Sequence, residues 1–221
     1  MTTKWDIETD LIVVGSGAAG LTSALTASSC GLNVLVIEKA SVYGGTTALS
    51  GGVIWVPNNS LMNEQGIEDS TDKAVTYLKY NVGNRVSETK LSKLALTAPK
   101  MLKHMMDNNF LEVTTFENFP DYNPESPGGL TQGGRSVEPK VFSGNRLGKV
   151  LKQMRKRPGL APAGIVGTMT ELRQLAEIRS NPKIFFKAWK VFPRNLWNKL
   201  ANRSHLSTGA SLIGWLRHGL I

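Results

Sequence analysis

The chain has 221 residues, of which 41% are hydrophobic, and it carries a formal net charge of +9. This length can bury a hydrophobic core, and the composition is that of a globular α/β protein, which excludes disordered and collagen-like chains. The single cysteine, Cys30, excludes an intrachain disulfide, nothing resembles a zinc site, and no apolar run reaches the about 18 residues of a membrane-spanning helix.

The N-terminal region has the order of elements found in dinucleotide-binding proteins. Residues 11–14, Leu-Ile-Val-Val, predict a buried strand, and Gly-Ser-Gly-Ala-Ala-Gly follows at once at residues 15–20. Residues 21–27 have the composition of a helix, and residues 32–37 predict a second apolar strand that ends at Glu38. A strand, a glycine turn, a helix, a strand and an acid in this order predict a Rossmann-like fold with a dinucleotide site.

Each residue of this pattern has a physical reason. Gly15 allows the tight turn, Gly17 lets the backbone approach a pyrophosphate, and Gly20 lets the helix pack closely on the strand. The free N–H groups at the start of the helix stabilise phosphate charge. Glu38 lies 18 residues after Gly20, where its carboxylate can accept both ribose hydroxyls and would repel a 2′-phosphate. NADP is therefore disfavoured.

A second loop distinguishes FAD from NAD. Residues 43–52, Tyr-Gly-Gly-Thr-Thr-Ala-Leu-Ser-Gly-Gly, follow closely after the ribose acid, where a plain NAD domain would continue with a helix. Backbone N–H groups and hydroxyls in such a loop can bind a second stretch of a long cofactor. This favours FAD over NAD, and the alternative is an ordinary flexible loop.

The sequence around these motifs resembles a known family. Residues 13–59 resemble the start of the fumarate reductase-like flavoproteins, and within them the 3-ketosteroid dehydrogenases, in which GGTT or GGST, SGG and W-x-P-N follow the acid in this order. Residues 120–122, Pro-Asp-Tyr, and residues 134–140, Gly-Arg-Ser-Val-Glu-Pro-Lys, also resemble that subgroup. The resemblance covers residues 1–150 and implies an α/β, Rossmann-like FAD-binding domain of the fumarate reductase flavoprotein (GR2) type.

The resemblance also implies which residues bind FAD. Those expected at its ADP half are Gly15, Ser16, Gly17, Ala19, Gly20, Glu38 and Lys39. Those expected along its pyrophosphate and flavin are Gly44, Gly45, Thr46, Thr47, Ala48, Ser50, Gly51 and Gly52. No metal site is expected.

The implied function is an FAD-dependent oxidoreductase that dehydrogenates a 3-ketosteroid or a similar polycyclic ketone. In such enzymes a base removes a proton beside the ketone, a hydride passes to flavin N5, and donors to the ketone oxygen stabilise the developing charge. By this resemblance, Tyr122 corresponds to a tyrosine that assists the tyrosine base of the family. The base needs this help because a phenol with a pKa of about 10 is a poor base on its own. The alternative for Tyr122 is a loop aromatic packed on the domain. No stretch matches the family's base tyrosine or the residues that hold the ketone.

The middle of the chain predicts helices, a short strand and a loop. Residues 70–82 and 87–109 show helical spacing of apolar side chains, and residues 112–116 predict a strand. Residues 118–147 are rich in Pro and Gly and predict a long loop, which in the family borders the substrate cavity.

Basic charge is concentrated in the last third of the chain. Residues 1–145 have 11 Lys and Arg against 15 Asp and Glu, whereas residues 146–221 have 15 against 2. This asymmetry predicts two parts, an FAD-binding part over residues 1–147 and a basic, helical part over residues 148–221 that begins the substrate or cap region.

Within the basic part, Thr168 and Glu171 predict a capping box that starts a helix through Ile178. Asn181 with Pro182 predicts the start of another helix.

Residues 183–203 mix basic and aromatic side chains, which leaves three interpretations. The segment is an insertion near the substrate entrance, an amphipathic surface on an anionic membrane, or a nucleic-acid patch. Since no nucleic-acid motif is present, the third is disfavoured and no nucleic-acid partner is expected. The acidic first ten residues do not fit a secretory signal, so we expect a cytoplasmic protein, and contact with the periphery of a membrane is one of the interpretations left open for residues 183–203.

Two other functions stay open from sequence alone. One is a fumarate reductase or succinate dehydrogenase-like flavoprotein, and the other is a non-catalytic fragment that binds a membrane or a partner through its basic helices. A dinucleotide fold uses a parallel sheet of more than two strands, and only two are convincing here. We therefore expect an incomplete FAD domain that binds FAD poorly and is inactive alone. No motif indicates the electron acceptor.

Overall fold

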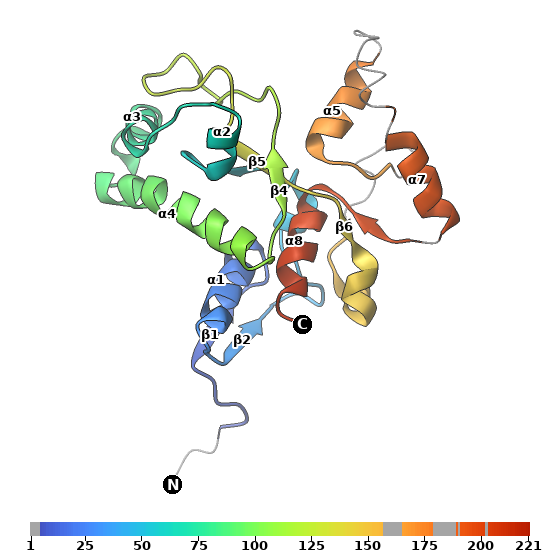
Figure 1. Ribbon diagram of the computed structural model, residues 1–221. Coiled ribbons are helices and arrows are strands. Elements are labelled where there is room, and N and C mark those ends of the chain that lie inside the picture. Colours follow the sequence, from blue (N-terminus) through green and yellow to red (C-terminus); the bar gives the residue numbers. More distant parts are fainter. Residues whose placement is uncertain (1–4, 157–164, 179–188, 190, 202) are drawn as a thin grey trace.

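The computed structural model describes residues 5–156, 165–178, 189, 191–201 and 203–221 (Figure 1). The N-terminal strands and helix lie at one end of the molecule, two longer helices flank a small antiparallel sheet, and the basic helical part lies on the opposite side of that sheet. A C-terminal helix runs through the middle and joins these groups.

The first group is a β-α-β unit, as predicted. β1 (Leu11–Val14) pairs in parallel with β2 (Val34–Ile37), and α1 (Ala18–Ser29) connects them. The helix begins earlier than residues 21–27 because the glycine turn itself supplies its first residues. Gly20 lies where α1 crosses β1, and a Cβ there would overlap the Gly15 carbonyl oxygen. The close helix–strand packing expected of Gly20 is therefore observed.

The parallel sheet has two strands within the described part of the chain. One side of it is covered by α1, whereas Ile12 and Val14 have exposed fractions of 57% and 81%. The two strands that were convincing in the sequence are thus the two that form, and their apolar side chains are only partly buried.

Three helices follow at the left of Figure 1: α2 (Ser60–Glu64), α3 (Thr71–Val82) and α4 (Glu88–Asp107). The predicted ranges of α3 and α4 agree with these bounds within two residues. α4 buries one face at alternating spacings of four and three, as the sequence pattern indicated. That face consists of Leu91, Ala95, Ala98, Leu102 and Met105.

The small antiparallel sheet corrects one prediction. Its order is β3 (Ile54–Trp55), β5 (Ser136–Pro139) and β4 (Val113–Thr115), with β5 in the centre. The range 118–147 was predicted as one long loop, but it contains β5 and also β6 (Phe142–Ser143). All four residues of β5 are buried, so no alternation marks the strand, and Pro139 argues against a central strand by the usual rule.

The basic part is helical. It contains η3 (Gly144–Gln153), α5 (Met169–Glu177), α7 (Val191–Leu200), β7 (His205–Leu206) and α8 (Thr208–His218). The predicted capping box is confirmed, since the Thr168 hydroxyl accepts from the Glu171 N–H while the Glu171 carboxylate accepts from the Thr168 N–H. The helix start predicted at residues 181–182 lies outside the described residues, as does most of 183–190. The division at residue 147 stays a prediction.

α8 carries the core through the middle of the fold. Leu212, Ile213 and Leu216 are buried, and the helix packs against α1, β5, β6 and the short helix η1 (Thr47–Leu49). Gly209 at its start lies so close to the Thr47 carbonyl oxygen that a Cβ would not fit. No helix in the described residues is long and apolar enough to span a bilayer.

A buried arginine fixes the loop that returns from β4 to β5. The Arg135 guanidinium donates to Asp69 through Nε (2.9 Å) and Nη2 (2.6 Å), and to Asp121 through Nη1 (2.8 Å). All three side chains are at most 2% exposed. The rings of Trp55 and Tyr77 lie 5.5 and 5.6 Å from the guanidinium carbon, on which they stack as cation–π partners.

Asp121 is held from three directions, because the Trp55 indole N–H and the Leu130 N–H also donate to its carboxylate, at 2.8 and 3.0 Å. Burial acts to raise the pKa of Asp69, but hydrogen bonds from Arg135 and from the Asn58 amide outweigh it and hold that pKa below its ordinary value. This cluster ties the loop of residues 118–135 to α3 and to the small sheet.

We expect Arg135→Met to lower the free energy of unfolding by about 3–5 kcal/mol, because it leaves two buried carboxylates without their cation. Urea unfolding followed by circular dichroism measures this. Lys79→Met is the control, since it removes the same type of charge from an exposed ion pair with Glu88 and should cost less than about 1 kcal/mol. Equal losses for the two variants would contradict a dominant role of the buried cluster.

Candidate functional site

Ser16 joins the glycine turn to the end of β2 and to the second glycine loop. Its side chain is buried, its hydroxyl donates to the Glu38 carboxylate, and its oxygen accepts from the Gly44 N–H at 3.0 Å. The Ser16 N–H also donates to Glu38 Oε2 at 3.0 Å. Three segments that are separate in sequence therefore meet at one hydroxyl.

Glu38 is held ionised beside this turn. The N–H of Ala40 donates to its Oε1 at 3.0 Å, and this bond, then the side chain and the N–H of Ser16, lower the pKa of Glu38 to about 2. Oε2 already accepts two of these hydrogen bonds and Oε1 accepts one, so one lone pair of Oε1 is left for a further donor such as a ribose hydroxyl. The geometry matches the acid expected at the end of the second strand.

The N-terminus of α1 faces the second glycine loop. Gly17 is the N-cap residue and has no side chain that could cap the helix. The Ala18 N–H donates instead to Thr47 Oγ1 at 3.1 Å. A Cβ on Gly45 would lie 3.4 Å from the Gly17 Cα, so the two backbones approach closely. A helix N-terminus next to glycines fits the diphosphate of a dinucleotide.

The second loop is shaped by backbone geometry that suits glycine. Gly44, Gly45 and Gly52 have φ values of +107°, +54° and +75°. The Ser50 hydroxyl donates to the Thr47 carbonyl at 2.8 Å and accepts from the Gly52 N–H at 3.0 Å. The start of α8 contacts this loop, because the Gly209 N–H donates to the Ser50 carbonyl at 3.0 Å.

The structure brings most of the expected cofactor residues together around the start of α1. Ala48 is buried as packing for the loop, whereas Ala19, Lys39 and Thr46 are exposed at its edge. The set as a whole fits an FAD through its glycine backbone, its helix N-terminus and its single carboxylate. Their individual roles stay predictions.

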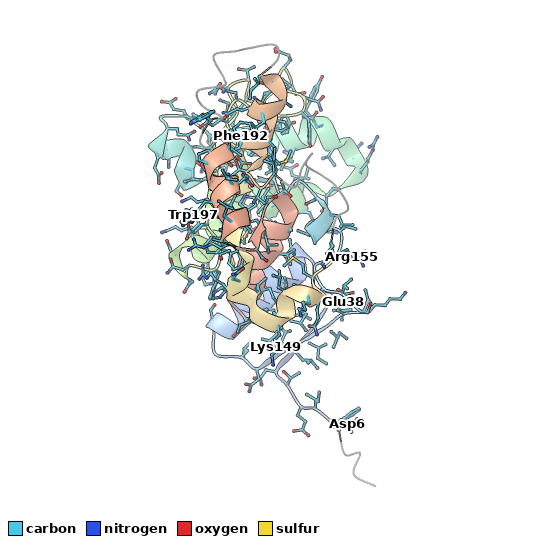
Figure 2. The ribbon with its side chains drawn as sticks, turned by 90° about the vertical axis from the view of Figure 1, so that its right-hand side faces the viewer. Asp6, Glu38, Lys149, Arg155, Phe192 and Trp197 are labelled. Atoms are coloured by element: carbon cyan, nitrogen blue, oxygen red, sulfur yellow. The ribbon has the colours of Figure 1, made fainter. Side chains whose placement is uncertain are left out.

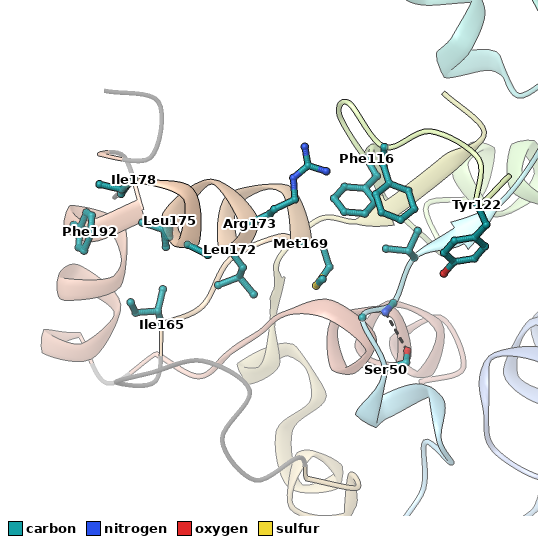
Figure 3. Close-up of a pocket in the computed structure, with 15 residues that line it drawn as sticks. Ser50, Phe116, Tyr122, Ile165, Met169, Leu172, Arg173, Leu175, Ile178 and Phe192 are labelled. Atoms are coloured by element: carbon teal, nitrogen blue, oxygen red, sulfur yellow. Dashed lines mark hydrogen bonds between the residues drawn. The ribbon is translucent and has the colours of Figure 1, made fainter. Parts of the chain in front are cut away.

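A large cavity begins where the second loop ends. Its volume is about 1060 Å³, and it lies between residues 50–53, the loop of residues 116–122, and α5 (Figure 3). Most of its wall is apolar, and Arg173 is the only charged side chain among its described lining residues. The apolar wall comprises Val53, Phe116, Phe119, Ile165, Met169, Leu172, Leu175, Ala176, Ile178 and Phe192.

Tyr122 stands at the end of the cavity that Ser50 also lines (Figure 3). Its side chain is 90% exposed, and its ring makes an edge contact with Phe119 at a centroid distance of 6.1 Å. It is therefore not packed into the domain, which disfavours the interpretation as a packing aromatic. Its backbone is fixed by the neighbouring Asp121 in the buried arginine cluster.

The wall formed by α5 was not predicted as part of the site. Met169, Leu172 and Ala176 follow one another at spacings of three and four, a signal that would have indicated one apolar helix face. The sequence could not show that this face of α5 lies opposite residues 50–53 and the loop of residues 116–122. Arg173 makes an ion pair with Glu177 at 3.2 Å and lies over the Phe116 ring at 5.6 Å.

A buried carboxylate fixes α5 to the small sheet. Glu138 in β5 is fully buried and accepts from the Thr170 N–H at the start of α5, at 3.1 and 3.3 Å to its two oxygens. Burial raises the pKa of Glu138, although the hydrogen bonds from residues 168–170 act in the opposite direction. The buried carboxylate of Glu138 and the N-terminus of α5 thus hold this wall of the cavity in place.

Comparisons with known proteins agree with this geometry. The family described as "FAD binding domain" matches residues 10–220. A 3-oxosteroid 1-dehydrogenase of Mycolicibacterium smegmatis is 38% identical over 96% of this chain and 37% of its own length. A 3-oxosteroid 1-dehydrogenase of Mycobacterium tuberculosis is 37% identical over 96% of this chain and 38% of its own length.

A solved structure is also similar. The 3-ketosteroid Δ1-dehydrogenase of Sterolibacterium denitrificans, in complex with 1,4-androstadiene-3,17-dione, matches with a TM-score of 0.78 and 34% identity, over 96% of this chain and 38% of that one. The chain therefore spans somewhat more than a third of the length of the relatives it matches.

The cradle predicts a specific effect of Gly17→Ala. A Cβ at this position meets only Thr47 Oγ1 at 3.6 Å, and the backbone is extended, so thermal stability without cofactor should hardly change. The added methyl would occupy space that the expected diphosphate needs, so we expect FAD affinity to fall at least about tenfold. Titration followed by flavin fluorescence measures this. Equal affinity in the variant would show that the diphosphate does not lie against Gly17.

Glu38 predicts a pH effect. A folded pKa of about 2, below the model-compound value of 4.5, means that Glu38 stabilises the fold above pH 4.5 and that this contribution is lost as the pH falls through about 2. Carbon-13 NMR of the carboxyl groups should show one titrating near pH 2, identified by its absence in Glu38→Gln. Glu64→Gln, an exposed glutamate, is the control. A Glu38 midpoint near 4.5 would contradict the hydrogen-bonded state.

Proposed function

The chain belongs to the FAD-binding domain family, and from that membership we propose that it is part of an FAD-dependent dehydrogenase acting on a 3-ketosteroid or a similar polycyclic ketone. The observation that carries the proposal is the apolar cavity of about 1060 Å³ between the second glycine loop and Tyr122. Its size is at the upper end of small-molecule sites, and its wall suits a rigid hydrocarbon skeleton. The relatives named above, which are 3-ketosteroid dehydrogenases, support the same substrate class.

The chain's own residues have distinct parts in this proposal. Bound FAD supplies the acceptor for the hydride. Gly17 and Gly45 would leave room for its diphosphate, and Glu38 would accept hydrogen bonds from its ribose. Residues 50–53, which line both the second loop and the cavity, would separate the cofactor side from the substrate side.

The cavity wall acts through desolvation. Apolar side chains on α5 and on the loop of residues 116–122 exclude water from a bound polycyclic ketone, and each Å² of apolar surface removed from water contributes about 25 cal/mol. A dicarboxylate would need several fixed cationic donors. Arg173 is the only charged residue among the described ones that line the cavity, and Glu177 already pairs with it. This supports a steroid over fumarate or succinate.

Tyr122 is proposed to assist the removal of the proton beside the ketone. Its hydroxyl lies on the cavity, and a phenol in such a position can donate to, or relay a proton from, a neighbouring base. No sequence stretch matches the family's base tyrosine, so this role rests on the resemblance and on position. We also propose a cytoplasmic location, supported by the single free thiol of Cys30, and peripheral contact of residues 183–203 with a membrane.

Ligand titration tests the substrate class. We expect the FAD-loaded chain to bind 4-androstene-3,17-dione, followed by the flavin spectrum, and to show no comparable response to fumarate. Leu172→Trp should weaken steroid binding at least about tenfold by filling the cavity while leaving FAD affinity unchanged. Leu96→Trp on the exposed side of α4 is the control.

Several outcomes would contradict the proposal. Tighter binding of fumarate than of the steroid would favour the dicarboxylate flavoprotein, and an unchanged steroid affinity in Leu172→Trp would place the ligand elsewhere. A folded chain that binds lipid vesicles but no FAD, even at a saturating excess of FAD, would favour the non-catalytic alternative.

A further inference from the structure

Arg173 reaches from one wall of the cavity to the other. It extends from α5, its guanidinium carbon lies 5.6 Å from the centre of the Phe116 ring, and its Nη1 and Nη2 lie 3.4 and 3.5 Å from the Asn118 carbonyl oxygen (Figure 3). Its Nε pairs with Glu177, one turn further along α5, at 3.2 Å. Among the described residues that line the cavity, no other carries a charge. One cation is therefore held at a wall that is otherwise mostly apolar.

The Arg173 guanidinium has hydrogen-bonding capacity that these contacts do not use. It carries five N–H groups, of which the Nε–H serves Glu177. The two contacts with the carbonyl oxygen are longer than the about 2.7–3.2 Å of well-formed N–H···O bonds. The side chain is 36% exposed, so its donors can reach a ligand. Arg135 shows that one guanidinium of this fold can hold two carboxylates at once, since it pairs with Asp69 and Asp121.

The cavity has room for more than a fused-ring skeleton. Small-molecule sites occupy about 300–1,000 Å³, and the volume here is about 1060 Å³. From its end at Ser50 and Tyr122 the cavity follows α5 to Phe192, which is 42% exposed and is labelled in Figure 2. Arg173 lies between these two ends, next to Phe116 (Figure 3). A ligand whose ketone points to Tyr122 can thus place a substituent of its far end at the guanidinium.

We propose that Arg173 binds a carboxylate on the side chain of the polycyclic ketone, at the end of the ligand opposite the ketone. A planar guanidinium matches a carboxylate through two parallel N–H···O bonds, and such charge-assisted bonds are stronger than neutral ones. They gain further strength where the surroundings are apolar. This role of Arg173 rests on the proposed function, because the ketone has to occupy the other end of the cavity.

Glu177 limits the site to a single carboxylate. It shares the one cation of the cavity, so a second fixed anion, as in a dicarboxylate, would find no partner among the described lining residues. The carboxylate of a ligand and that of Glu177 also repel each other across the shared guanidinium. Removing the charge of Glu177 should therefore favour an acidic ligand.

Calorimetric titration in the presence of excess FAD tests this role with three ketones, which are 3-oxo-4-androstene-17β-carboxylate, its methyl ester and 4-androstene-3,17-dione. We expect the carboxylate to bind at least about tenfold more tightly than the ester, and high salt to reduce this preference. Arg173→Met should abolish the preference but change the affinity for the two neutral ketones less than about threefold, because methionine keeps the apolar stem. Arg173→Lys should keep part of the preference, since lysine retains the charge without the planar fork.

Glu177→Gln separates ligand binding from the stability of α5. It breaks the same ion pair as Arg173→Met, but it leaves the guanidinium free, so the preference for the carboxylate should grow at least about threefold. Equal affinities of the wild-type chain for carboxylate and ester, equal weakening of all three ketones by Arg173→Met, or a loss of the preference in Glu177→Gln would overturn the proposal. Failure of all three ketones to bind would contradict the proposed function itself, and the role of Arg173 with it.

Discussion

The site depends on one buried hydroxyl. Ser16 donates to Glu38 and accepts from Gly44, and in this way it fixes the distance between the glycine turn, the ribose acid and the second glycine loop. The carboxylate stays ionised because the Ala40 N–H and then the hydroxyl and N–H of Ser16 donate to its charged form, which lowers the pKa of Glu38 to about 2. Alanine at position 16 would remove this link while leaving the Glu38 carboxylate and the backbone amides of the glycine turn in the chain.

Segments from the C-terminal part complete the second glycine loop and the cavity, both of which also contain N-terminal segments. α8 lies under η1, and its Gly209 N–H supports Ser50, so the second loop is shaped by a helix that begins more than 150 residues later. Two buried anchors of different kinds hold the walls of the cavity. Arg135 holds the loop that carries Tyr122 through two carboxylates, and Glu138 holds α5 through a helix N-terminus. Each anchor is buried, and each connects one wall of the cavity to the small sheet or to the residue before it.

The sequence predicted what local patterns encode. The β-α-β unit, the bounds of α3 and α4 and the capping box of Thr168 follow from apolar spacing, glycine placement and side-chain capping, all of which act over a few residues. β5 could not be predicted, because a strand buried on both faces has no alternation and contains Pro139. The cluster around Arg135 could not be predicted either, because Arg135 pairs with Asp69 and Asp121, which lie 66 and 14 positions earlier in the sequence. Only the resemblance drew attention to the segments of Asp121 and Arg135, without indicating that they touch.

The two parts of the chain offer different environments to a ligand, and the cavity lies where these parts meet. The N-terminal part offers backbone amides and one carboxylate, which suit a charged, hydrated cofactor. The basic part offers apolar helix faces on α5 and α7, which suit a hydrophobic ligand. A dehydrogenation of a polycyclic ketone needs both environments within contact distance, and residues 50–53 provide that boundary, since Gly52 lines the cavity while its N–H donates to the Ser50 hydroxyl. The glycine there has no room for a Cβ against Thr208, so the start of α8 packs directly on this boundary.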